Sequence, residues 1–190
     1  MCIRDSEGID LANMGEALYF LERFEEALAY FEDGLAIFIE IGDRACEGDC
    51  RVNVGRAMLA CQRDDEALAM LDRGRSICEE TGRREYSALG LYYTAEAYLR
   101  KKEYSAASRA FERSQKIYVE LELHDSWRPE LGLARVALAS GDRETARKHL
   151  DAAASSVERA RAALRPSDDS VRFAEEVADV ARLRAELDGA

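Results

Sequence analysis

Five cysteines carry the side chains in this sequence that are best suited to metal binding or nucleophilic chemistry. Cys46 and Cys50 are one helical turn apart, and Cys61 follows eleven residues later, about 16 Å farther along a helix. A structural zinc ion needs four ligands at about 2.0–2.3 Å, and the sequence holds no Cys-X-X-Cys pair. We therefore predict no metal site and interpret the cysteines as small buried hydrophobic side chains in a reducing, cytoplasmic compartment. They are Cys2, Cys46, Cys50, Cys61 and Cys78.

The two histidines and the acidic pairs do not form a recognisable catalytic arrangement. A nucleophile triad needs a Ser or Cys beside a His and an orienting acid. His124 stands at the end of a predicted helix and His149 on a predicted outer helix, so we expect both side chains in solvent. The acidic run 64–66 suits the positive start of a helix. With no Gly-rich phosphate loop either, we expect no enzyme and no cofactor.

The composition favours a helical protein with a hydrophobic core. Hydrophobic residues make up 47% of the 190 residues and charged residues 34%, with only two prolines and 12 glycines. Good helix formers dominate, and the regular turn signals of a β-sandwich are missing. No apolar run approaches the roughly 18 residues of a membrane helix. We therefore expect an all-α fold without membrane contact.

Acidic residues are concentrated in the first part of the chain. The formal net charge is -11, with 8 basic and 19 acidic side chains in residues 1–80 and 19 of each in the remainder. This balance argues against nucleic-acid binding, which needs a basic face. The acidic part should attract partners with basic segments, and salt should weaken that attraction. The alternative is a solvated acidic surface that maintains solubility.

The first six residues, Met1–Ser6, have no amphipathic pattern and do not join the repeats described below. The string resembles one reading frame of a transposase-end adapter used in preparing sequencing libraries. We interpret it as a cloning or sequencing scar, to be left out of fold reasoning. The chain would then be a fragment of a longer protein whose upstream domains are missing. The alternative is a native N-terminus that frays.

Residues of matching type recur along the chain at steps of 40 residues, with a last step of 39 in two of the sets. Small residues occupy two registers, and large apolar residues occupy two others. Four such sets are Gly15, Gly55 and Ala95; Ala27, Ala67, Ala107 and Ala146; Phe31, Leu71, Phe111 and Leu150; and Ile37, Ile77 and Ile117. Such a period indicates a repeat protein in which each unit is one supersecondary element.

Apolar residues at steps of three and four predict two helices in each unit. Gly42 is suited to end a helix and Asp43 to cap the next one, and Ser126 is suited to cap a helix with Pro129 in its first turn. The small residues mark places where two helices touch. The predicted helices are roughly 8–22, 24–41, 44–62, 65–80, 84–101, 103–122, 127–140, 143–164 and 168–187.

The spacing of Gly15, Ala27 and Phe31 resembles the tetratricopeptide repeat (TPR). The 40-residue unit is similar to the long-helix, MalT-like subtype found in bacterial regulators and scaffold proteins. The resemblance covers roughly residues 8–165. It implies a right-handed α-solenoid of about four helical hairpins, with units at about 7–43, 44–82, 83–125 and 126–166. Residues 167–190 would form a C-terminal capping helix that packs through Val171, Phe173, Ala174, Val177, Val180 and Leu183.

The resemblance also implies a concave groove lined by the first helix of each hairpin. Asn13 and Asn53 would offer amide groups to an extended ligand backbone, although bonding between neighbouring helices or simple repeat duplication explains them equally well. The charged residues would add selectivity or pair with one another. The predicted groove residues are Asn13, Glu16, Asn53, Arg56, Tyr93, Glu96 and Arg135.

Two functions follow as expectations. The first is a scaffold that binds a peptide or partner protein non-covalently in the groove. The alternative is a regulatory or sensor region of a larger bacterial signalling or transcription-regulating protein whose effector domain is missing. Self-association is left open in both.

Overall fold

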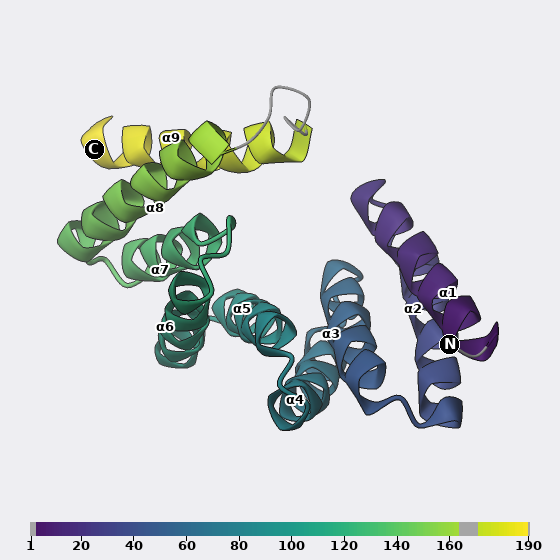
Figure 1. The fold of residues 1–190 in the computed structure, drawn as a ribbon. Helices are drawn as coiled ribbons and strands as arrows, with labels where there is room; N and C mark the ends of the chain where they lie inside the picture. Colours follow the sequence, from purple (N-terminus) through teal and green to yellow (C-terminus); the bar gives the residue numbers. More distant parts are fainter. Residues whose placement is uncertain (1–2, 164–170, 190) are drawn as a thin grey trace. The chain divides into compact units, whose positions relative to one another are not determined.

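The computed structural model describes residues 3–163 and 171–189, and within these ranges the chain consists of helices joined by short turns (Figure 1). No strand occurs in the described ranges, which confirms the predicted all-α class. None of the helices there combines the length and the low charge needed to cross a lipid bilayer. The helices are α1 (Ile3–Phe20), α2 (Phe24–Ile41), α3 (Arg44–Ala60), α4 (Asp64–Glu80), α5 (Arg84–Arg100), α6 (Tyr104–Glu120), α7 (Trp127–Ala139), α8 (Arg143–Ala163) and α9 (Val171–Gly189).

The predicted helix boundaries agree with the structure to within about three residues, except at the start of α1. The helix begins at Ile3, five residues earlier than expected. Arg4 pairs with Glu7 and Glu40 at 3.3 and 3.4 Å, which explains how this extra turn is held. The interpretation of Met1–Ser6 as a scar stays a prediction, as do the limits of the four units.

The turns repeat with the same period as the sequence. The backbone has a positive φ at Glu22, Gln62 and Lys102, with values of 58°, 62° and 62°. A second series follows at Gly42, Gly82 and Glu122, with values of 72°, 73° and 52°. A left-handed residue ends a helix by directing later N–H groups back to its last carbonyls. The 40-residue period therefore specifies the turns as well as the core.

The cap predicted at Asp43 is confirmed, because its side chain accepts a hydrogen bond from the Cys46 N–H at 3.0 Å. The cap predicted at Ser126 is wrong. Its backbone is itself helical, with φ −59° and ψ −13°, and its side chain makes no capping hydrogen bond. A capping oxygen reaches the first N–H groups from an extended backbone, which Ser126 does not have.

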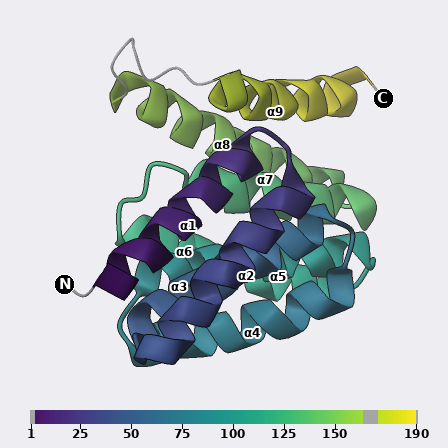
Figure 2. The ribbon, with the colours of Figure 1, turned by 90° about the vertical axis from the view of Figure 1, so that its right-hand side faces the viewer.

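The chain divides into two compact units, Met1–Ala97 and Tyr98–Ala190, with the division inside α5. In the first unit, α1 and α2 form an antiparallel hairpin (Figure 2). The predicted small residues do lie where helices touch. A Cβ atom added to Gly15 would come 2.7 Å from the Phe31 ring, and one added to Gly55 would come 2.6 Å from Leu71. The first two hairpins therefore close through the same glycine-to-large-residue contact.

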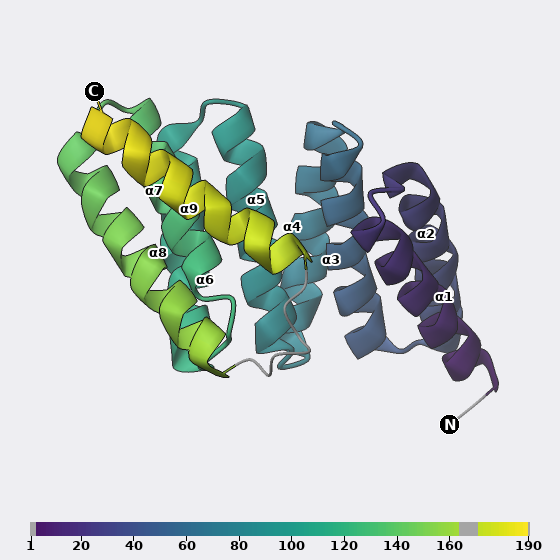
Figure 3. The ribbon, with the colours of Figure 1, turned by 90° about the horizontal axis from the view of Figure 1, so that it is seen from above.

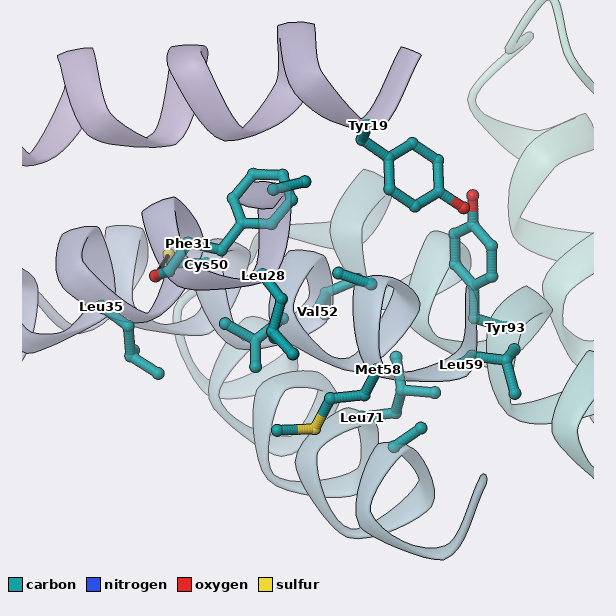
Figure 4. Close-up of a cluster of buried hydrophobic side chains, with 14 of the residues drawn as sticks. Tyr19, Leu28, Phe31, Leu35, Cys50, Val52, Met58, Leu59, Leu71 and Tyr93 are labelled. Carbon is teal, nitrogen blue, oxygen red and sulfur yellow. Dashed lines mark hydrogen bonds between the residues drawn. The ribbon is translucent and has the colours of Figure 1, made fainter. Parts of the chain in front are cut away.

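The first unit encloses a continuous hydrophobic core from α1 to α5 (Figure 4). Phe31 and Leu71 have no exposed surface, and Val52 and Ala57 of the helix between them are also fully buried. Burying such side chains stabilises the fold by about 1.5–3 kcal/mol each. The core therefore joins neighbouring hairpins as well as the two helices within each.

In the second unit, α7 packs on α6 and α8. Gly132 of α7 lies against the Phe111 ring, so an added Cβ would come within 2.4 Å. Trp127, Ala134 and Leu150 are buried in the core of this unit. His124 is exposed as predicted. The prediction for His149 is wrong: it is half-buried, and its Nδ1 lies 2.7 Å from Glu130 Oε2.

The last helix, α9, packs against α8. Val180 and Leu187 are buried in the core of the second unit, and Leu183 is half-buried against it. The C-terminal end of α9 lies beside the start of α8 (Figure 3), where Arg143 donates a 2.6 Å hydrogen bond to the Leu187 carbonyl. The backbone of α9 is described from residue 171, but four of the predicted capping residues have side chains outside the described part of the structure: Val171, Phe173, Ala174 and Val177.

Candidate partner-binding site

Three helices that begin successive hairpins, α1, α3 and α5, are neighbours in the first unit. Arg56 of α3 forms an ion pair with Glu16 of α1. On its other side, α3 contacts α5, where Val52 stands 3.4 Å from the Cβ position of Gly90. Six of the seven predicted groove residues lie on these helices, two on each. We call this set the first-helix face: Asn13, Glu16, Asn53, Arg56, Tyr93 and Glu96.

The seventh predicted residue, Arg135, lies on α7 in the second unit and is exposed. It is therefore treated apart from the first-helix face, which belongs to the first unit.

Arg56 is a buried residue that holds α1 and α3 together. Only 6% of its surface is exposed. Its guanidinium lies 4.4 Å from the centroid of the Tyr19 ring and 5.5 Å from that of Phe31, while its Nη2 pairs with Glu16. A buried charge is costly unless it has such partners. The charged groove residues were expected either to select a ligand or to pair with one another. In the structure, Glu16 and Arg56 pair with each other.

The two equivalent asparagines have different surroundings. Asn13 is exposed on α1, whereas Asn53 is 7% exposed and forms a side-chain hydrogen bond with Tyr86 of α5. The position 40 residues before Tyr86 holds Cys46, whose side chain is too short to reach as far as a tyrosine hydroxyl. Asn13 therefore lacks the aromatic partner that covers its equivalent.

The α5 residues of the face are packed against the rest of the unit. Tyr93 is 7% exposed and meets the Tyr92 ring edge-on at 5.1 Å. The hydroxyl ends of Tyr93 and Tyr19 point toward one another (Figure 4). Glu96 is half-buried. The face is thus closed over α3 and α5 and is most accessible along α1.

A polar cluster at the start of α5 was missed by reasoning from the sequence. Asp49 of α3 is 8% exposed and accepts hydrogen bonds from Arg83, whose guanidinium also lies 5.5 Å from the centroid of the Tyr86 ring. Burial raises the pKa of Asp49, and Arg83 opposes that change. A signal was present in the repeat, since the positions 40 residues away hold Ile9 and Leu89, and an acid among apolar residues needs a partner.

The cysteines are distributed as small side chains. Cys50 and Cys78 are buried, and Cys46 and Cys61 are half-buried. Burial raises the pKa of Cys46 to about 11 and those of Cys50 and Cys78 to about 12. Thiols with such values are poor nucleophiles at neutral pH. Across the described ranges, no three His, Cys, Asp or Glu side chains gather closely enough to hold a metal ion.

The comparisons agree with the internal period. The sequence model of the tetratricopeptide repeat matches residues 7–80. No curated protein matches the chain.

Solved structures with the same fold extend the similarity to nearly the whole chain. Aspartyl phosphate phosphatase F from Bacillus subtilis matches with a TM-score of 0.80 at 14% identity, over 98% of this chain and 46% of that one. Apo RapI matches with a TM-score of 0.74 at 15% identity, over 82% and 57%. The chain thus spans about half the length of these proteins.

A third structure is similar over its full length. It is a putative kinesin light chain with nearly identical TPR-like repeats from Podosopora anserina, with a TM-score of 0.66 and 16% identity over 98% of both chains. The match of residues 7–80, the 40-residue period and these folds lead to one conclusion. Residues 7–80 match the tetratricopeptide repeat, and the described part of the chain has the fold of solved TPR-like repeat structures.

Proposed function

We propose that this chain is a non-enzymatic scaffold that binds a peptide or partner protein on the first-helix face, with the ligand lying along α1. The observation that carries the proposal is the inner stripe of α1, where Asn13 is exposed between two exposed apolar side chains, Ile9 and Phe20, which are 40% and 56% exposed. The equivalent positions on α3 are buried or half-buried. Apolar contacts flanking an amide are typical of peptide-recognition surfaces.

The stripe is rigidly supported. Arg56 fastens α3 to Glu16 and Tyr19 of α1, so the helix backbone under Asn13 is already in place before a ligand arrives. A preformed surface loses less conformational entropy on binding than a flexible one. A Rap protein complexed with competence and sporulation factor has the same fold, with a TM-score of 0.80 at 13% identity over 98% of this chain and 56% of that one. That complex supports the use of this fold to hold a partner.

Charge favours a partner with basic segments. α1 carries four acidic side chains and one arginine, and its Asp10 side chain is exposed. Such a surface accelerates the arrival of basic ligands, and the acceleration decreases as salt rises. We do not include Arg135 in this binding site, because it is exposed on α7 of the second unit.

The proposal is tested by selecting peptides from a displayed library on the immobilised full chain and measuring their dissociation constants for variants. We expect Asn13→Ala and Phe20→Ala each to weaken binding about tenfold, which corresponds to about 1.4 kcal/mol. Glu32→Ala, an exposed change on α2, is the matched control and should leave the constant unchanged. Equal binding to all four proteins would rule out the α1 stripe as the site.

A second candidate is the regulatory region of a larger signalling or transcription-regulating protein. The observation that favours it is length, since the chain spans 57% of RapI and 46% of phosphatase F. The test is to express the complete open reading frame and to measure whether a selected peptide changes the activity of any flanking domain. An open reading frame without a flanking domain would exclude this candidate.

A further inference from the structure

A second row of side chains on α1 is exposed, and each of its residues directly follows a residue of the inner stripe in the sequence. The equivalent row on α3 is covered by α2. The outer stripe of α1 consists of Asp10, Met14 and Ala17, continued by Leu21 directly after the end of the helix. Met14 is 49% exposed and Leu21 is 66% exposed. Successive residues on a helix are about 100° apart, so this stripe is separate from the inner stripe that carries Asn13.

The internal repeat shows what covers the equivalent stripe on α3. Adding 40 to each number gives Cys50, Val54, Ala57 and Cys61. The first three are 2%, 0% and 0% exposed and belong to the same buried cluster as Leu28 and Leu35 of α2. The Cys50 thiol donates a hydrogen bond to the Phe31 carbonyl of α2, at 3.1 Å. An amphipathic helix therefore seals this stripe where the repeat is complete.

One difference between the two stripes indicates the chemistry of a helix that would fit on the stripe of α1. Asp10 replaces Cys50, and a carboxylate accepts hydrogen bonds but has no proton to donate to a helix carbonyl. A helix that covers this stripe would therefore have to present a cationic or N–H donor to Asp10. Of the other acids of α1, Glu7 already pairs with Arg4 and Glu16 with Arg56, whereas Asp10 is exposed on the stripe itself. A second copy of α1 would bring another Asp10 to this stripe, whereas a lysine- or arginine-bearing helix would pair with it.

We propose that the outer stripe of α1 is a docking site for an amphipathic helix of another protein, seated as α2 is seated on α3. The helix presents aliphatic side chains to Met14, Ala17 and Leu21 and a basic side chain to Asp10. This site is independent of the peptide site on the inner stripe.

The probe is a lactam-bridged helical peptide with the sequence of residues 24–41, in which lysines replace the acids at positions 25, 32 and 33. Its helicity is verified by circular dichroism, and its binding to the full chain is measured by fluorescence anisotropy. We expect Met14→Asp and Leu21→Asp to weaken binding at least tenfold. Both side chains are largely exposed, so the variants should fold. Val119→Asp, at a 59% exposed position in the second unit, is the matched control and should bind as the parent does.

A second arm tests the charge. The same bridged peptide with its original acidic residues should bind at least fivefold more weakly, and Asp10→Asn should reduce that preference. Equal binding of the parent and Met14→Asp would overturn the proposal, as would the lack of binding by a peptide shown to be helical. A concentration-dependent dimer in sedimentation that Met14→Asp abolishes would also overturn it, because the stripe would then serve a second copy. Asn13→Ala should leave probe binding unchanged, which separates this result from a failure of the inner site.

Discussion

The guanidinium of Arg56 in α3 lies over the ring of Tyr19 in α1, 4.4 Å from its centroid, and pairs with Glu16 one turn earlier on the same helix. This contact links the first two hairpins across the face on which we propose that a ligand binds. Arginine stacked on an aromatic ring and excluded from water is more strongly attracted to it than at an exposed site. The stability of the first unit therefore depends on a residue that the sequence alone suggests as a ligand contact.

Replacing Arg56 with Ala should destabilise the protein by about 2–3 kcal/mol, because the ring contacts and the partner of Glu16 are lost together. Urea unfolding followed by circular dichroism measures this change. The matched control is Arg63→Ala, which removes another Arg–Glu pair whose side chains are 40% and 59% exposed. Its cost should stay below about 1 kcal/mol. Equal losses for the two variants would contradict a buried anchoring role for Arg56.

Replacing Gly15 with Ala should destabilise the first hairpin by about 1–3 kcal/mol, because the new methyl group would meet the fully buried Phe31 ring at 2.7 Å. Gly90→Ala is the control within α5. Its methyl group would stand 3.4 Å from Val52, an ordinary contact, and alanine favours a helix by about 1 kcal/mol over glycine. The midpoint of thermal unfolding should therefore decrease for Gly15→Ala and increase for Gly90→Ala.

Replacing Gln62 with Gly should stabilise the protein by up to about 1 kcal/mol, since glycine adopts its φ of 62° without steric strain. The converse change, Gly82→Ala, should cost about 1 kcal/mol. Nothing lies within 4 Å of the added Cβ at Gly82, so its φ of 73° is the sole source of strain. Denaturant midpoints measure both effects, and a neutral result at both positions would mean that the turns are less constrained than their φ values indicate.

Stability should decrease as the pH rises above about 9, because buried thiols keep their protons in the folded state and lose them in the unfolded state. Burial raises the pKa of Cys50 to about 12 from 9.0. As the pH rises, this thiol therefore ionises in the unfolded chain before it ionises in the folded one. At pH 10 the difference should lower the free energy of unfolding by about 1.4 kcal/mol for Cys50 alone. Chemical unfolding at pH 8 and pH 10 should show a smaller decrease for Cys50→Ala than for the parent. Cys61→Ala, at a half-buried thiol, should change the decrease less.

Much of the fold can be predicted from the sequence, because helix ends and helix contacts depend on residues at short or regular spacings. The spacing of Gly15, Gly55 and their partners predicts which helix surfaces touch, and the structure confirms these contacts. Helix ends follow from turn residues close in sequence. The early start of α1 and the helical backbone at Ser126, whose N–H donates to the Leu123 carbonyl, were not predicted.

The surroundings of each site residue could not be predicted from the repeat. Asn13 and Asn53 occupy the same register in neighbouring repeats, so the sequence treats them as equals. Tyr86 covers one of them, and the residue 40 positions earlier is too short to cover the other. His149 likewise pairs with Glu130 of the preceding helix, a contact that no helical periodicity reports.

The sequence by itself determined the period, the helical hairpins and the small residues at their crossings, because these depend on steps of three, four and 40 along one chain. Only the tertiary structure decided which polar side chains are buried as anchors and which remain accessible. The physical reason is that burial depends on the length and type of side chains delivered by neighbouring hairpins. Arg56 is buried against the ring of Tyr19, whereas Met14 and Leu21 stay exposed on a stripe whose counterpart in α3 is covered by α2.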